Sequence, residues 1–488
     1  MAGTPEVEAA ARGTFKEWVE VLAIPNVSAA PADIQRNTNW FEQAFKRRGY
    51  RTRQLPNNGK PMLFAEAPNA KDTKSTVLFY AHIDGQPVTP SEWNQESPWK
   101  PTLKQKTPDG RWMELPIERL YDAKVDPEWR LFARSSSDDK APILMLLAAI
   151  DALQAAGVEP AINVKVLLDT EEEVSSPSLG TVIRENLAFL KCDDLVVLDG
   201  PMHPSNRPTL VFGNRGIARA TLTVFGPRQE LHSGHYANYV ANPAMRLAQL
   251  MASMKDEDGR VTVKHYYDGI ALDDRARRVM AAVPDDEPAL RKRLGVAETE
   301  KVGGNYQEAM QYPSLNIRGI KSADVGGKAR TIIPDHATAE IDMRTVPETP
   351  PERLFDLLKG HVTAQGYHLV EGEPTDDDRA RYPKLASLMM GKGSSSGTAV
   401  RTDLDSPIGV WLREAMKRAH GADPIEIRMM GGTVPTGVAV GALKVPFAIV
   451  PLVNADNSQH SFDENMRIGN YLDGILTLEA ILRLEKSR

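Results

Sequence analysis

Short β-rich runs alternate with helical patterns in both outer parts of this chain, and this alternation constrains the fold more than any other feature. Strands are indicated at residues 75–80, 163–169, 195–198 and 447–452, and helices at residues 5–23, 31–48, 139–156, 408–420 and 467–484. Alternating strands and helices form a largely parallel sheet with helices on both faces. We therefore expect an α/β fold for these parts of the chain.

The middle of the chain follows a different pattern. Half-exposed strands are indicated at residues 216–225, 313–319 and 337–344, with helices at residues 242–254 and 351–365. This order is typical of a smaller α+β domain inserted into the first one. The predicted division is an outer domain of residues 1–214 and 376–488 split by an inserted domain of residues 215–375. Residues 91–128 and 375–405 are interpreted as surface insertions.

Composition excludes several classes of protein. The 488 residues are 41% hydrophobic and 25% charged, which is typical of a soluble globular protein. Because 59 basic residues face 65 acidic ones without a basic cluster, we expect no nucleic-acid partner. No apolar stretch approaches the roughly 20 residues that span a bilayer, so we expect no membrane partner. The first residues lack the pattern of a signal peptide, which predicts a cytoplasmic protein; a periplasmic or secreted one stays open if a signal was removed before residue 1.

The chain has one cysteine, Cys192. A single cysteine excludes an intramolecular disulfide and a zinc site built from several cysteines. Its neighbours Asp193 and Asp194 disfavour the thiolate, so we do not expect Cys192 to be a nucleophile. Any metal site in this chain must therefore use histidines and carboxylates.

Imidazoles and carboxylates lie beside the predicted strand ends, where open α/β sheets bind ligands. They are His82, Asp84, Asp138, Asp139, Glu171, Glu172, Glu173, Asp199 and His460. Carboxylates crowded at one pole of a sheet repel one another, and a divalent cation removes that repulsion. Ligands of this type without thiolate suit zinc, manganese or cobalt. Their number allows two ions, each with one histidine, one terminal carboxylate and one shared carboxylate.

Each of these residues also has an ordinary structural explanation. Asp138 could cap the helix that follows it, and Asp199 before Gly200 is typical of a turn. An acidic triplet such as residues 171–173 is most often a solvated turn. It is the occurrence of all these residues in one order along the chain that points to a metal centre.

Eight segments in this order resemble a known family. The sequence is similar to the two-zinc metallopeptidases that include carnosinase, aminoacylase, glutamate carboxypeptidase and succinyl-diaminopimelate desuccinylase, with the carnosinase-like branch closest. The segments are YAHIDGQPV (80–88), SSSDDKAP (135–142), DTEEEVSS (169–176), VLDGP (197–201), ELHSGHY (230–236), ARTIIPDHATAEIDMRTVP (329–347), GGTVPTG (431–437) and SQHSFDEN (458–465).

The resemblance implies a role for each residue near the strand ends. Asp138 bridges two divalent ions, most simply zinc with manganese or cobalt as alternatives. His82 and Asp199 complete one ion site, Glu173 and His460 complete the other, Asp84 orients His82, and Glu172 is the general base. The implied enzyme is a metal-dependent hydrolase that cleaves an amide bond of a small peptide, as a dipeptidase or carboxypeptidase, with a hydroxide that bridges the metals. An N-acyl amino acid amidohydrolase with the same machinery is the alternative.

The resemblance also implies a homodimer, with the inserted domain acting as lid and dimerisation domain around the catalytic outer domain. His232 of this domain would reach the active site of the partner subunit and stabilise the oxyanion. Arg344, Thr331, Gly432 and Thr433 would bind the substrate, with Arg344 at its carboxylate.

Two other classes of function are open. Residues 393–397 fit the G-x-S-x-G pattern of serine hydrolases, with Asp403 and His420 downstream, but the surrounding polar stretch lacks the strand and helix of a nucleophile elbow. A catalytically inactive binding module is the second class, and the presence of all five predicted ligands with Glu172 argues against it. The family's usual glycines are Ser135, Ala141 and Ser175 here, changes between small residues that we expect the fold to accommodate.

Overall fold

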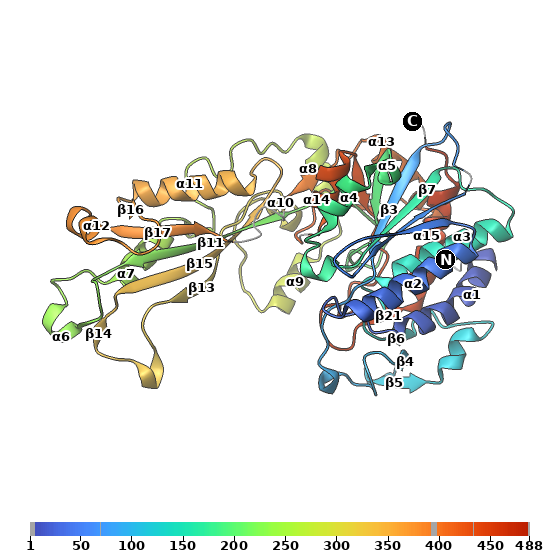
Figure 1. Ribbon diagram of the computed structural model, residues 1–488, viewed down its shortest axis with the longest axis horizontal. Coiled ribbons are helices and arrows are strands. Elements are labelled where there is room, and N and C mark those ends of the chain that lie inside the picture. The colour runs from blue at the N-terminus through green and yellow to red at the C-terminus, as the bar shows by residue number, and fades with distance from the viewer. Residues whose placement is uncertain (1–4, 69, 392–397, 433, 487–488) are drawn as a thin grey trace.

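A computed structural model describes residues 5–68, 70–391, 398–432 and 434–486, which form a larger and a smaller lobe joined by a neck (Figure 1). The larger lobe contains an eight-stranded sheet of order β1-β2-β7-β3-β8-β20-β9-β19. The strands are β1 (Arg51–Leu55), β2 (Met62–Glu66), β3 (Thr76–His82), β7 (Asn163–Asp169), β8 (Asp194–Val197), β9 (Thr209–Val211), β19 (Ile425–Ile427) and β20 (Phe447–Ile449). The four neighbours β7, β3, β8 and β20 run parallel, so their carboxyl ends meet at one edge.

Helices cover both faces of this sheet. Val77 and Phe79 of β3 pack into one apolar cluster, and the alternate residues Leu78 and Tyr80 pack into another on the opposite face. The first cluster includes α1 (Pro5–Leu22), α2 (Pro31–Arg47), α3 (Lys140–Ala155), α13 (Pro407–His420) and α15 (Ile468–Arg483), and the second includes α4 (Leu179–Glu185), α5 (Leu187–Leu190) and α14 (Thr436–Leu443). The predicted α/β architecture is confirmed.

The smaller lobe is a separate α+β unit, as predicted. Its five-stranded sheet has the order β13-β15-β11-β17-β16 and is antiparallel except for the last pair. The elements are β11 (Gly216–Phe225), β12 (Leu231–His232), α6 (Ser233–Tyr236), α7 (Pro243–Ala252), β13 (Asn316–Lys321), η4 (Gly326–Lys328), β14 (Ile332–Ile333), β15 (His336–Thr345), α11 (Pro351–Ala364), β16 (His368–Leu369), α12 (Asp376–Arg381) and β17 (Leu385–Met390). Because β17 pairs with β11, this sheet continues past residue 376, where the return to the outer domain was predicted.

Residues 91–128, predicted as a surface insertion, contribute strands to a four-stranded antiparallel sheet of order β21-β6-β4-β5. Its elements and the adjoining short helices are η1 (Pro90–Glu92), β4 (Thr102–Lys106), β5 (Trp112–Leu115), η2 (Ile117–Tyr121), β6 (Arg130–Phe132) and β21 (Asn465–Arg467). β6 lies just before the segment that carries Asp138, and β21 lies just after the segment that carries His460. This small sheet therefore fixes the relative position of two segments that are more than 300 residues apart.

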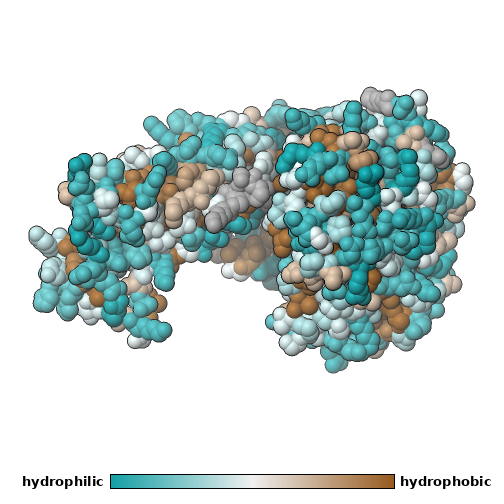
Figure 2. Space-filling model, in the orientation of Figure 1, coloured by the Kyte–Doolittle hydropathy of each residue, from teal (hydrophilic) through white to brown (hydrophobic). Residues whose placement is uncertain are grey.

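The neck contains helices that no sequence pattern predicted. They are α8 (Asp274–Ala282), α9 (Glu287–Leu294) and α10 (Tyr306–Ala309), beside the strand pair β10 (Gly213–Asn214) and β18 (Val400–Arg401). Asp285 contacts His203 of the larger lobe at 3.1 Å, and Arg275 contacts Asp405 at 2.8 Å. The space-filling view shows a deep recess between the two lobes (Figure 2). Within the described ranges, no helix is long and apolar enough to cross a membrane.

Candidate metal centre

The five predicted ligands converge at the carboxyl edge of the parallel strands. His82 ends β3, Glu173 lies in η3 (Glu172–Val174) just after β7, and Asp199 follows β8 by two residues. Asp138 and His460 come from the loops before α3 and β21. The structure groups them as two triads, His82–Asp138–Asp199 and Asp138–Glu173–His460, each with ligand atoms within 4.8 Å of one another.

Asp138 belongs to both triads, and its two carboxylate oxygens face different histidines. Oδ1 lies 2.9 Å from His82 Nε2, and Oδ2 lies 3.1 Å from His460 Nε2. His460 Nε2 also lies 3.2 Å from an oxygen of Glu173. Asp138 thus turns one carboxylate oxygen toward the histidine of each triad. This is the position that a ligand shared by two ions would need.

The electrostatics of the triads show an excess of buried negative charge. Burial opposes protonation of His82, but its hydrogen bonds with Asp138 and Asp84 raise its pKa well above the usual value. Hydrogen bonds with Asp138 and Glu173 raise the pKa of His460 to about 10. Burial raises the pKa of Asp199 to about 6.

Divalent cations fit this donor set. The carboxylates drive both imidazoles to hold protons, and a metal cation can replace a proton at a histidine nitrogen. Burial opposes ionisation of Asp138, yet hydrogen bonds with His460 and His82 lower its pKa, so this carboxylate is ready to bind cations. Two ions with two imidazoles and three carboxylates give a donor set of nitrogen and oxygen that suits zinc, manganese or cobalt.

Asp84 lies behind the first triad. Its Oδ1 is 3.4 Å from His82 Nδ1, on the side of the ring opposite the ligand nitrogen. The same carboxylate accepts hydrogen bonds from the backbone N–H groups of Glu172 and Glu173, both at 3.1 Å, and from Ser28 Oγ at 2.5 Å. Asp84 thus positions the His82 ring and the loop of Glu172 together. Such partners orient a ligand and fix its tautomer.

The three neighbouring glutamates at residues 171–173 have different surroundings. Glu173 joins the second triad, and Glu171 turns away to an ion pair with Lys60 at 2.5 Å. Glu172 lies between, where burial raises its pKa well above the usual value and the charges of His82, Asp199 and Asp138 act on it. Glu172 is therefore close to both triads without belonging to either.

The backbone near the ligands has several uncommon conformations. The peptide bond between Asp138 and Asp139 is cis. Ser135 and Ser175, where the family usually has glycine, have φ of 61° and 69°. That left-handed region is where glycine is favoured, so the two serines adopt a conformation that suits the glycines usual at these positions.

The other predicted site residues lie apart from the triads. His232 and Thr331 are exposed on the smaller lobe, where Ser233 N–H donates to the Thr331 carbonyl at 3.2 Å. His232 ends β12, which pairs with β14, the strand that begins just after Thr331. β14 and α6 lie at the far end of the molecule from β3 and β7 (Figure 1). Arg344 lies near the neck end of β15, and Gly432 belongs to the larger lobe. Thr433 lies outside the described residues.

Sequence patterns missed several residues that support the ligands. Gln86 donates a hydrogen bond to Glu173 at 2.7 Å, and Ser28 contacts Asp84. Glu464, fully buried beside the loop of Asp138, was part of a matching segment but received no role. Its position four residues after His460 was the only available indication.

Cys192 and His420, which a cysteine nucleophile or a serine hydrolase would use, have surroundings different from those of the triads. Burial raises the pKa of Cys192 to about 12, which disfavours a reactive thiolate at neutral pH. His420 forms a hydrogen bond with Thr477 at 2.7 Å, and the serine run at residues 393–397 lies outside the described residues.

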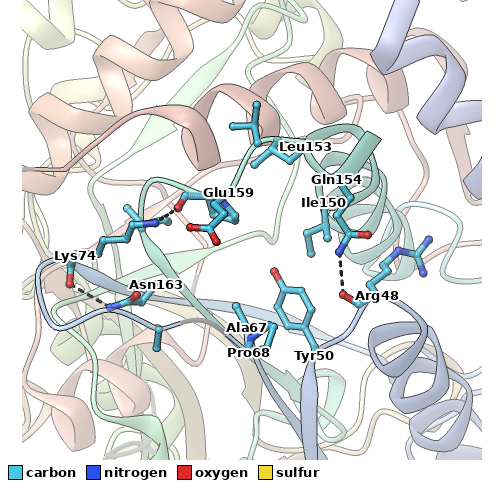
Figure 3. A pocket seen from close by; sticks show the side chains of 14 residues that line it. Arg48, Tyr50, Ala67, Pro68, Lys74, Ile150, Leu153, Gln154, Glu159 and Asn163 are labelled. Atoms are coloured by element: carbon cyan, nitrogen blue, oxygen red, sulfur yellow. Dashed lines mark hydrogen bonds between the residues drawn. The ribbon is translucent and has the colours of Figure 1, made fainter. Parts of the chain in front are cut away.

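A cavity of about 180 Å³ lies at the opposite edge of the sheet, where β7 begins at Asn163 (Figure 3). Its walls carry Tyr50, Leu153 and Glu159, and neither metal-ligand triad contributes to it.

Comparison with known proteins agrees with this arrangement. Residues 212–369 match the family model of a peptidase dimerisation domain. The chain is 27% identical to a Cys-Gly metallodipeptidase of Schizosaccharomyces pombe, over 83% of this chain and 78% of that protein. It is 26% identical to the Beta-Ala-His dipeptidase of Mus musculus, over 94% and 90% of the two chains.

A solved structure extends the similarity to the fold. An M20 family metallo-carboxypeptidase from Sulfolobus solfataricus superposes with a TM-score of 0.73 at 27% identity, covering 96% of this chain and 98% of that chain. The similarity therefore covers both lobes and the neck.

Proposed function

We propose that this chain, which is similar to metallopeptidases of the M20 family, hydrolyses the amide bond of a small peptide, as a dipeptidase or carboxypeptidase. The observation that carries the proposal is the pair of triads sharing Asp138, with Glu172 beside both. The similar proteins are named for dipeptidase or carboxypeptidase activity, which supports the small-peptide class.

The side chains at the carboxyl edge have different roles in the proposed reaction. His82, Asp138 and Asp199 would hold one ion, and Asp138, Glu173 and His460 the other. When bound, two such ions polarise the scissile carbonyl and lower the pKa of a water molecule. Glu172 accepts the proton of the attacking water and passes it to the leaving nitrogen. A carboxyl whose pKa is raised by burial is suited to hold a proton between these two steps.

The substrate's free carboxylate is bound from the smaller lobe in this proposal. The guanidinium of Arg344 can form two parallel hydrogen bonds with a carboxylate. Gly432 lies between β19 and α14 of the larger lobe. The inserted domain, predicted as residues 215–375 and continued in its sheet to β17, then acts as a lid. Its closure brings the two groups of binding residues together.

A cavity of about 580 Å³ in the neck is the proposed site for the substrate's side chain. It is lined by Pro201, two residues after Asp199, and by Gly431, next to Gly432, with Tyr306, Met310 and Met430 among its apolar walls. We expect Ala289→Phe, which adds bulk to this lining, to raise KM for Gly-Leu by about tenfold. Gly-Gly, which has no side chain, is the internal control and should keep its KM; an equal change for both peptides would contradict this placement.

Removing metal tests the catalytic class. We expect dialysis against a chelator to abolish hydrolysis of dipeptides and of N-acyl amino acids, and zinc, manganese or cobalt to restore it, because both triads lose their cations. The relative rates on the two substrate classes separate a peptidase from an amidohydrolase. A serine-directed phosphonate should leave activity unchanged. Full activity without metal, or inactivation by the phosphonate, would refute the proposal.

A mixing experiment tests whether His232 acts on the partner subunit, as the position of α6, which begins just after His232, far from β3 and β7 suggests (Figure 1). Glu172→Ala and His232→Ala variants should each be nearly inactive. Random dimers formed from an equal mixture should recover about a quarter of the wild-type activity, because half the dimers are hybrid and one of their two sites is complete. No recovery, despite hybrid dimers shown by tagged subunits, would place the action of His232 elsewhere.

A further inference from the structure

Glu464 is fully buried and accepts hydrogen bonds from one short segment of chain. Its Oε1 accepts from Ser137 N–H at 2.9 Å, Ser137 Oγ at 2.8 Å and Asp138 N–H at 2.9 Å. Its Oε2 accepts from Ser135 N–H at 2.8 Å and from Arg134 Nη1 at 2.8 Å. Five donors from residues 134–138 thus surround a single carboxylate, immediately before and at the shared ligand Asp138.

Arg134 extends this arrangement to two further segments. Its Nη2 donates to the carbonyl of Ser461 at 2.9 Å, the residue after His460, and to the carbonyl of Pro87 at 3.4 Å. The guanidinium carbon also lies 5.3 Å from the ring centroid of Trp93. The Arg134–Glu464 pair therefore connects the loops of Asp138 and His460 and the segment that follows His82.

The two triads depend on this pair to different degrees. His82 ends β3 and Asp199 follows β8, so the sheet itself fixes these two ligands. His460 is half-exposed, with 53% of its side chain accessible, and lies in a loop between β20 and β21. The position of that loop relative to Asp138 depends on the Ser461 contact, the Glu464 contacts and the pairing of β21 with β6.

We propose that Glu464 and Arg134 form a positioning pair that holds the Asp138 and His460 loops in register and thereby sets the affinity of the Asp138–Glu173–His460 triad for its ion. This inference rests on the proposed two-metal function. Partners behind metal ligands typically change metal affinity about 10- to 100-fold when they are replaced.

The test is a metal titration of Glu464→Gln with a chromophoric zinc chelator as competitor. Wild-type protein should bind two zinc ions tightly. Glu464→Gln should keep one tight ion and bind the second about 10- to 100-fold more weakly. The visible absorption of the cobalt-loaded variant should change for one of its two ions, which a loss of fold stability alone would not produce.

The matched control is Asp151→Asn, which removes a carboxylate bonded to the buried Arg48 at 2.6 Å. Asp151 lies in the later half of α3, about three turns beyond the Asp138 loop, and belongs to neither triad, so this variant should lose stability and keep both zinc affinities. Removing one partner of a buried ion pair is strongly destabilising, so Glu464→Gln itself could fail to fold. In that case Ser137→Ala, which removes one donor and keeps the pair, should weaken the second ion about two- to tenfold.

The outcomes distinguish failure of the positioning role of Glu464 and Arg134 from failure of the proposed two-metal function. Unchanged affinities in Glu464→Gln, or in Ser137→Ala if that variant is used, overturn the positioning role. An equal loss of affinity in Asp151→Asn overturns it as well. A wild-type protein that does not bind two ions contradicts the proposed function instead.

Discussion

Glu172→Gln should fold normally, bind its full complement of metal and lose almost all turnover. The substitution removes the group that takes and returns a proton but leaves both triads intact, because Glu172 belongs to neither. General acid–base catalysis typically contributes about 10²- to 10⁴-fold to a rate, so we expect kcat to fall by that factor. The measurement is steady-state hydrolysis of a dipeptide, with metal content determined on the same sample.

Glu171→Gln is the matched control. Glu171 is the preceding carboxylate, and it forms an ion pair with Lys60 rather than facing the triads. This variant should retain kcat within a few-fold of wild type. A Glu172→Gln enzyme with near-normal turnover, or an equal loss in Glu171→Gln, would show that the proton is handled by another group.

The second large effect is expected from Asp138, the carboxylate common to both triads. Asp138→Ala should weaken the binding of both ions and reduce kcat/KM by roughly 10³-fold or more, since several kcal/mol of transition-state stabilisation depend on metal chemistry. Asp199→Ala removes a ligand of only one triad and should leave one ion bound. Elemental analysis after gel filtration gives the stoichiometry.

Asp169→Asn is the control for Asp138. Asp169 is a buried carboxylate at the end of β7, but it accepts hydrogen bonds from Tyr80 at 2.8 Å and Ser176 at 2.6 Å and is in neither triad. It should keep two ions. If Asp138→Ala also retained two ions, Asp138 would not be a shared ligand.

The sequence predicted the elements whose burial is continuous. β3 is buried along almost its whole length and α3 is apolar on nearly all sides, so both stand out as uninterrupted apolar runs. The helices α8 and α9 did not stand out, because both are rich in charged residues. The small sheet of β4, β5, β6 and β21 joins strands that are distant along the chain, so no local pattern could indicate it.

The candidate site was predictable to a similar extent. Parallel strands bring His82, Glu173 and Asp199 to one edge, and that convergence follows from the strand pattern. The family resemblance, and not periodicity, supplied the roles of Asp138 and His460. The role of Glu464 was not predictable, since its five donors lie more than 320 residues earlier in the chain.

Anomalous diffraction at the zinc edge from crystals of the zinc-loaded protein tests the central claim most directly. We predict two peaks, roughly 3.5–4 Å apart. One should be coordinated by His82, Asp138 and Asp199, and the other by Asp138, Glu173 and His460. A single peak, or two peaks that do not share Asp138, would contradict a two-metal centre at this edge of the sheet.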